Sequence, residues 1–234
     1  MATKTTLGNI CKCELGGTPS RDVKEYWGGD IAWINSGKIN DFRVTDQSEF
    51  ITELGLKKSA TKLMPPKTVV IAITGATLGQ VSILEIPAAA NQSVIGILEN
   101  NELPFEFIYP YIKYKLQLLL TYQTGGAQQH INKQNVEDLE INVPNAVYMN
   151  KYKRIVNPIY NAISNNCFTI DKMNALKNTL LPKLMLESGD TSADKLSFRS
   201  RAPPVVYQYF FTFLHYLLDI ILFPSIHCVV LNIN

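Results

Sequence analysis

Short apolar runs separated by Gly, Asn and Pro characterise residues 1–147, a pattern typical of a domain built from strands and a few helices. Two β-branched runs, Thr68 to Ile73 and Thr77 to Leu84, flank a Gly-containing turn and predict a pair of buried strands. Val94 to Leu98 predicts a third strand. The pattern therefore favours a compact α/β domain of the mixed α+β kind.

Apolar residues recur with a helical period between Phe105 and Thr121, and the period stops at Gly125-Gly126. We expect this helix to cover one side of the sheet. A second, short helix is predicted at Asn132 to Asp138, where Asn132 can serve as the N-cap. A last strand, Leu139 to Val143, follows and is closed by proline.

Residues 148–190 carry one apolar stripe at helical spacing, which predicts a long helix. Its members are Ile155, Ile159, Ile163, Cys167, Ile170, Met173, Leu176, Leu180 and Leu184. Asn157-Pro158 resembles an N-cap followed by a first-position proline, so the main helix is expected to begin there, and Pro182 is expected to break or kink its end. About 25 residues make a rod of roughly 37 Å. Such a narrow seam favours pairing with another helix, in a coiled-coil-like arm, over packing on residues 1–147.

The segment 191–234 has a different composition. A polar linker leads into Val205 to Phe223, an apolar run interrupted by four polar residues, and this run is nearly long enough to span a bilayer. Asp219 lies well inside it and would cost about 2.5–3.5 kcal/mol on insertion. The run is therefore open to three interpretations: a membrane span, an apolar helix docked on the protein, or a tail unrelated to the rest because the original sequence was cut short.

Composition narrows the class of protein. The chain has 234 residues, of which 46% are apolar and 18% charged, and this excludes a disordered, collagen-like or purely coiled-coil protein. The formal net charge is only +2, so the chain as a whole produces no strong electrostatic field. Residues 1–147 carry 13 basic and 15 acidic residues. Four Cys are far too few for a disulfide scaffold, and no cleavable signal precedes residue 20, so a cytoplasmic location is expected.

Catalytic motifs are missing from the sequence. His130 is the one histidine outside the tail, and no nucleophile elbow, HExxH, Walker or dinucleotide motif occurs. The Gly-rich stretch 74–79 lacks the Lys of a phosphate-binding loop and is better explained as a hairpin turn. Cys11 and Cys13 have no second pair at zinc-finger spacing, which favours an ordinary buried strand. Trp27, Trp33 and the group from Tyr109 to Tyr114 are interpreted as core rather than stacking residues.

Amides, hydroxyls and a few cations gather at the predicted loops and strand ends. These side chains bind base edges and phosphates in DNA, although the same residue types also populate ordinary turns. The candidates for DNA contact are Thr18, Ser20, Arg21, Lys38, Thr77, Gln80, Gln92, Gln128, Gln129, Asn132 and Lys133. Arg21, Lys38 and Lys133 are candidates for phosphate or guanine, and Thr77, Gln80, Gln92, Gln128, Gln129 and Asn132 for base edges or sugars.

Five ordered sequence blocks resemble the target recognition domain of type I restriction-modification specificity subunits. After Leu7-Gly8-Asn9-Ile10, which opens the resemblance, they are Gly16-Gly17-Thr18-Pro19-Ser20-Arg21, the run from Tyr26 to Ile34, Thr74-Gly75-Ala76-Thr77-Leu78-Gly79, Asn91-Gln92-Ser93, and the run from Gly125 to Asn132 before Leu139 to Pro144. Tyr152 to Val156 and Leu180 to Met185 are similar to the start and end of the family's spacer helix region. The resemblance covers about residues 5–190.

The resemblance implies a division into a target recognition domain (1–147), a spacer and dimerisation helix (148–190) and an unmatched apolar tail (191–234). It implies a non-catalytic reader of double-stranded DNA that works with modification (methyltransferase) subunits and a restriction (motor-nuclease) subunit. No cofactor is expected in this chain, whereas S-adenosylmethionine, ATP and Mg are expected on the partner subunits.

The chain departs from the family because it carries one recognition domain rather than two. Two explanations stay open: a half-subunit that self-associates through the helix 158–181, or a truncated remnant whose tail arose when the reading frame was lost. The rival from another class is a membrane-anchored binding protein with its span at 205–223. A third alternative, a small-molecule enzyme, would rest on His130.

Overall fold

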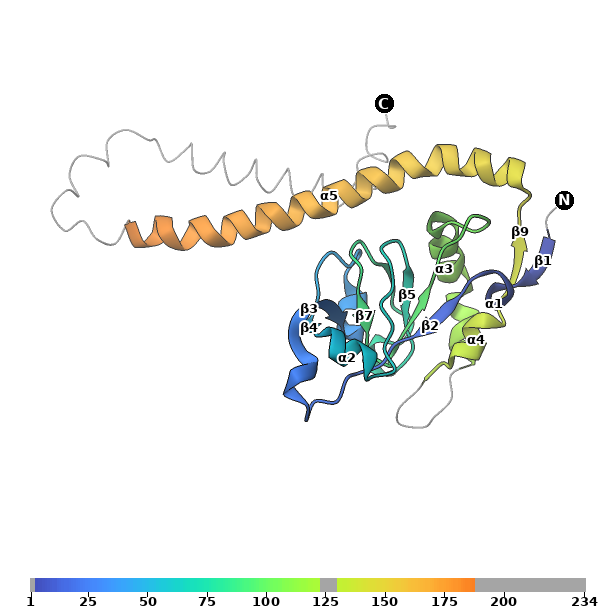
Figure 1. The fold of residues 1–234 in the computed structure, drawn as a ribbon. Coiled ribbons are helices and arrows are strands. Elements are labelled where there is room, and N and C mark those ends of the chain that lie inside the picture. The colour runs from blue at the N-terminus through green and yellow to red at the C-terminus, as the bar shows by residue number, and fades with distance from the viewer. Residues whose placement is uncertain (1–2, 123–129, 188–234) are drawn as a thin grey trace, which may run out of the picture. The chain divides into compact units, whose positions relative to one another are not determined.

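The computed structural model describes residues 3–122 and 130–187, with the side chains of 184–187 left out of account. Its centre is an antiparallel sheet of four strands in the order β2-β8-β5-β6, of which β2 and β5 are labelled in Figure 1. The strands are β2 (Cys13–Leu15), β8 (Val94–Ile97), β5 (Val69–Ala72) and β6 (Val81–Ile83). The structure thus confirms the three strands that the apolar runs predict.

A second sheet has the order β4-β3-β7 and combines β3 (Trp27–Ile34) with β4 (Glu49–Ile51) and β7 (Ala89–Ala90). The short elements around the two sheets are η1 (Lys24–Tyr26), η2 (Ser36–Asn40), α2 (Glu53–Lys57) and η3 (Gly75–Thr77). A separate pair joins β1 (Thr3–Thr6) to β9 (Glu140–Val143), with α1 (Leu7–Ile10) and α4 (Lys133–Glu137) beside it. The predicted last strand therefore exists, but it pairs with the N-terminal strand.

The two inner strands of the central sheet, β5 and β8, are buried on both faces, which explains why they are continuously apolar. Val69 and Ile71 of β5 belong to one core cluster, and the alternate residues Val70 and Ala72 belong to another. Helix α3 (Phe105–Thr121) covers the first face, packing through residues such as Ile108 and Ile112. Side chains alternate between the faces of a strand, so two covering layers require apolar residues at every position. The prediction that this helix covers one side of the sheet is confirmed.

The cap of α4 is also as predicted. The Asn132 side chain accepts a hydrogen bond from the Asn135 backbone N–H at 2.8 Å, and the Asn135 side chain accepts one from the Asn132 backbone at 3.1 Å. This reciprocal capping box satisfies two of the donors that a helix start leaves unpaired.

Helix α5 (Ala146–Glu187) corrects the predicted start of the long helix. It begins after Pro144, where the Asn145 side chain accepts from the Tyr148 backbone N–H at 3.1 Å, and it continues through Pro158 and Pro182. An interior proline costs about 3 kcal/mol. The turns before Pro158 are held by burial of Met149 and by packing of Tyr152 on the core, which offsets that cost.

The early part of α5 packs on the domain, which differs from the expected arm. Tyr152 and Tyr160 make edge-to-face contacts with Phe107 and Phe105, at centroid distances of 5.8 and 5.5 Å. From residue 171 to 183 every side chain is exposed. The chain divides into two units, residues 1–173 and 174–234.

Among residues 3–122 and 130–187, no helix has both the length and the apolar character needed to cross a membrane. The run 205–223, on which the membrane interpretation depends, lies outside the described residues.

Candidate functional site

Several loops that carry the candidate residues leave the central sheet at the same edge. The register places the end of β2 beside the start of β8 (Leu15 opposite Ile95) and the end of β5 beside the same start (Ala72 opposite Val94). β6 begins next to the end of β5. Because neighbouring strands run antiparallel, the loops 16–21, 73–80 and 91–93 emerge together.

Hydrogen bonds tie these loops to one another. The Gly17 N–H donates to the Ala90 carbonyl at 2.8 Å, and the Ile73 N–H donates to the Ser93 carbonyl at 2.9 Å. The Ile131 N–H donates to the Ile73 carbonyl at 2.9 Å, which brings in the chain from residue 130. Gly16 lies so close to the 90–91 backbone that a Cβ atom would be 2.0 Å from the Asn91 oxygen, so only glycine fits there.

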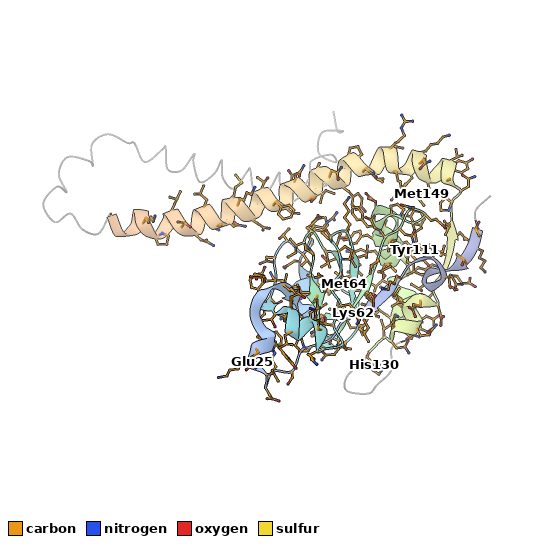
Figure 2. All side chains as sticks on the ribbon, in the orientation of Figure 1. Glu25, Lys62, Met64, Tyr111, His130 and Met149 are labelled. Carbon is orange, nitrogen blue, oxygen red and sulfur yellow. The ribbon has the colours of Figure 1, made fainter. Side chains whose placement is uncertain are left out.

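Helix η2 joins the same group. The Asn91 N–H donates to the Ile34 carbonyl at 3.0 Å, just before η2, and η2 contacts η3 of the 73–80 loop. We call the assembled loops, residues 16–21, 35–40, 73–80, 91–93 and 130–132, the loop edge. Helix α5 anchors at the other end of the sheet, near Glu85 beyond the end of β6. Figure 2 agrees, because Met149 of α5 lies on the opposite side of the domain from His130.

Most of the candidate residues lie on the loop edge. Gln80 and Gln92 are exposed, and the Thr18 hydroxyl donates to the Gln92 side-chain oxygen at 2.6 Å. The Thr77 hydroxyl donates to the Thr74 carbonyl at 3.4 Å. The Ser20 hydroxyl accepts a long bond from the Asp22 N–H at 3.4 Å. Gln128 and Gln129 lie outside the described residues.

Arg21 is held by a carboxylate and by aromatic rings. Its two terminal nitrogens donate to the two Glu49 oxygens at 2.6 and 2.7 Å, and its guanidinium lies 3.6 Å from the centroid of the Trp27 ring. This fork is the strong, bidentate form of the arginine–carboxylate interaction. Hydrogen bonds from Arg21 hold the pKa of the Glu49 carboxyl below its ordinary value.

The other two cationic candidates are also paired with acids. The Lys38 ammonium bonds to Asp46 and lies 3.4 Å from an Asp41 oxygen. Lys133 pairs with Glu137, one helical turn away in α4, at 3.1 Å. The side-chain oxygen of the neighbouring Asn132 accepts the hydrogen bond that caps α4. Thus each cation selected from the sequence has a carboxylate beside it.

The two tryptophans each donate a hydrogen bond to a backbone carbonyl of the loop 16–21. The Trp33 ring N–H donates to the Gly17 carbonyl and the Trp27 ring N–H to the Ser20 carbonyl, both at 3.1 Å. Trp33 is 3% exposed, which confirms its interpretation as a core residue. The same interpretation is wrong for Tyr114, which is 80% exposed because it lies on the outer side of α3.

Cys11 and Cys13 lie in the core cluster beneath α3, as small apolar side chains do. Burial raises the pKa of each thiol to about 12. Among the described parts of the chain, no group of three or more His, Cys, Asp or Glu side chains could hold a metal ion.

Sequence reasoning missed the carboxylates of the site. Glu49 reaches Arg21 only because β4 pairs with β3, and no spacing rule connects two residues 28 positions apart. Asp46 lies eight positions from Lys38, across a loop, so no helical or strand period relates them either.

Comparison with known proteins gives a consistent result. A family model for the type I restriction modification DNA specificity domain matches residues 2–176. A type I restriction enzyme specificity subunit of Escherichia coli is 29% identical over 188 residues, which are 78% of this chain and 43% of that protein. One from Haemophilus influenzae is 25% identical over 189 residues, 79% of this chain and 40% of that protein. The chain thus spans about two fifths of the length of these relatives.

Solved structures show the same fold. The S subunit of a type I restriction-modification system from M. genitalium matches with a TM-score of 0.54 and 18% identity, over 79% of this chain and 46% of that one. The HsdS subunit from Thermoanaerobacter tengcongensis matches with a TM-score of 0.51 and 14% identity, over 70% and 38%. With a family match over residues 2–176, the chain belongs to the type I restriction modification DNA specificity domain family.

Proposed function

We propose that this chain is the sequence-reading part of a type I restriction-modification complex, and that the loop edge is the surface that contacts double-stranded DNA. The observation that carries the proposal is the convergence of exposed amides and hydroxyls from separate loops on one edge of a buried sheet. Gln side chains can form hydrogen bonds with adenine, and Ser or Thr side chains with several bases. The rigid sheet holds these side chains at fixed distances from one another.

The near-neutral charge of the edge supports a shared role in binding. A protein that binds DNA alone usually gains affinity from unpaired Lys and Arg, but Arg21 and Lys38 on the edge, and Lys133 next to it, are each paired with a carboxylate. Modification subunits would supply the missing phosphate contacts. Base contacts from this chain would then select the sequence, while affinity comes from the assembly.

The catalytic steps belong to the partners in this proposal. Methyl transfer with S-adenosylmethionine would take place on modification subunits, and ATP and Mg would serve a restriction subunit. The family directs DNA recognition, and the role of this chain would be non-catalytic.

The late part of α5 supports self-association. Met173, Leu176 and Leu180 are each 45–58% exposed and share one helical face. A second copy could pair along this stripe, within the predicted segment 158–181, and form a coiled-coil-like arm. A two-fold pair would present two recognition domains and require a symmetric bipartite site.

The test is to co-express the full chain with a modification subunit in cells that lack adenine methylation, and to map methylated adenines by sequencing. The proposal predicts methylation in one defined sequence context. The double variant Gln80→Ala, Gln92→Ala should lose or relax that context, while the control Asn150→Ala, at an exposed amide on α5, should keep it. Methylation without sequence dependence, or none in any pairing, would contradict the proposal.

A further inference from the structure

Arg21, Lys38 and Lys133 share one arrangement: each faces a carboxylate. The pairs differ in strength. Glu49 binds Arg21 through both oxygens at 2.6 and 2.7 Å, and Lys38 has two carboxylates, Asp46 and Asp41. Lys133 has Glu137 at 3.1 Å. All three pairs are partly exposed, so a DNA phosphate could compete for each cation.

Glu49 is placed to control how strongly Arg21 attracts phosphate. Each of its two oxygens accepts a hydrogen bond from one terminal nitrogen of Arg21, and its negative charge balances the charge of the guanidinium. The Trp27 ring, 3.6 Å away, keeps the guanidinium in place from the side. Arginine has five N–H donors in all, so the fork leaves donors for a directed contact.

We propose that Glu49 limits sequence-independent binding of DNA by neutralising Arg21 on the loop edge. Non-specific binding depends on charge alone, because it comes from the release of counterions around phosphates. A neutral Arg21–Glu49 pair releases few counterions, yet it keeps a positioned guanidinium for a base edge or a single phosphate. This inference rests on the proposed function, since it concerns the same edge and the same ligand.

The proposal makes a graded prediction for the neighbouring pair. Asp46→Asn should free Lys38 only in part, because Asp41 stays 3.4 Å from the ammonium. Glu49→Gln removes the only carboxylate that the structure places on Arg21 within the described residues. The effect of Glu49→Gln should therefore exceed that of Asp46→Asn.

The experiment measures binding of the purified full chain to a random-sequence fluorescent duplex by anisotropy, from 50 to 200 mM salt. The control is Glu140→Gln, which removes the same charge from an exposed pair with Lys4 at 2.9 Å, on the β1–β9 strands and outside the loop edge. Circular dichroism checks that each variant is folded. Glu49→Gln should bind about twofold to fivefold more tightly than wild type, the range that an exposed ion pair accounts for.

The slope of log affinity against log salt should also steepen by about one, the amount expected for one additional phosphate contact. Glu140→Gln should leave both quantities unchanged. If Glu49→Gln matches wild type or Glu140→Gln, or binds more weakly, the proposal for Glu49 is overturned while the proposed function stands. If the wild-type chain gives no sequence-dependent methylation and binds no duplex, the proposed function fails, and the role of Glu49 fails with it.

Discussion

Polar side chains in the candidate loops separate into those that hydrogen-bond the local backbone and those that project from the loop edge. The same residue types occur in both classes, so a residue type does not reveal the class. Asn132 has the type of a base-reading residue but caps a helix, whereas Gln80 projects into solvent. The sequence could predict that amides gather in these loops. It could not show which amides the backbone would use, because a cap depends on local backbone geometry.

The buried thiols give a prediction at the residue scale. Cys11 and Cys13 should resist alkylation by iodoacetamide at pH 8, because burial raises their pKa to about 12 and thiolate is the reactive form. After unfolding in urea both should react quickly. Mass spectrometry of the alkylated peptides measures this, and fast labelling of either thiol in the folded protein would contradict the burial.

The same shift has a consequence for stability. The folded state keeps these protons up to a pKa of about 12, while the unfolded chain releases them near the ordinary thiol pKa of 9.0. Stabilisation by the buried thiols is therefore complete below pH 9 and is lost as the pH rises toward 12. Urea unfolding at pH 8 and pH 10 should show a lower free energy of unfolding at pH 10.

At the scale of elements, a buried ion pair joins the domain to α5. Arg43 bonds to Glu85 at 2.9 Å, with side chains 2% and 9% exposed, and Ser164 of α5 donates to the other Glu85 oxygen at 2.8 Å. The sequence predicts the helix from its stripe but places its start too late. That start depends on burial of Met149 against residues far away in the chain, which no local pattern records.

This contact gives a second prediction. Glu85→Gln should lower the free energy of unfolding by about 3–5 kcal/mol, because it leaves the Arg43 charge buried without a counter-charge. Ser164→Ala should cost only about 0.5–1.5 kcal/mol, the contribution of one hydrogen bond. Urea denaturation measures both, with the exposed Glu140→Gln as a control that should change stability by less than 1 kcal/mol. Equal losses for Glu85→Gln and Glu140→Gln would show that the Arg43 pair is not buried in solution.

For the whole molecule, the important fact is that the apolar stripe of α5 stays exposed at its later residues. Hydropathy spacing predicts that stripe, but it does not distinguish a partner helix from the domain itself. In the structure the early turns pack on the domain, and the side chains of 171–183 are exposed.

Placing charged residues in the apolar stripe of α5 tests whether two copies of the chain pair through it. The double variant Leu176→Lys, Leu180→Lys should be monomeric in analytical ultracentrifugation at micromolar concentration, whereas the wild-type chain should form a dimer, because two buried lysines would oppose the pairing. Lys177→Glu, which changes a charge beside the stripe, serves as the control and should remain dimeric. A wild-type chain that is monomeric at these concentrations would exclude pairing between copies.

Photo-cross-linking measures whether the loop edge touches DNA. A photoreactive amino acid is placed at Gln80, at Gln92 or at Lys4 in the full chain, bound with a modification subunit to plasmid DNA. If the loop edge contacts DNA, adducts form from positions 80 and 92, enriched in the methylated sequence context, and none form from position 4 on β1. Adducts from position 4 alone would place DNA away from the loop edge and exclude it as the DNA-contacting surface.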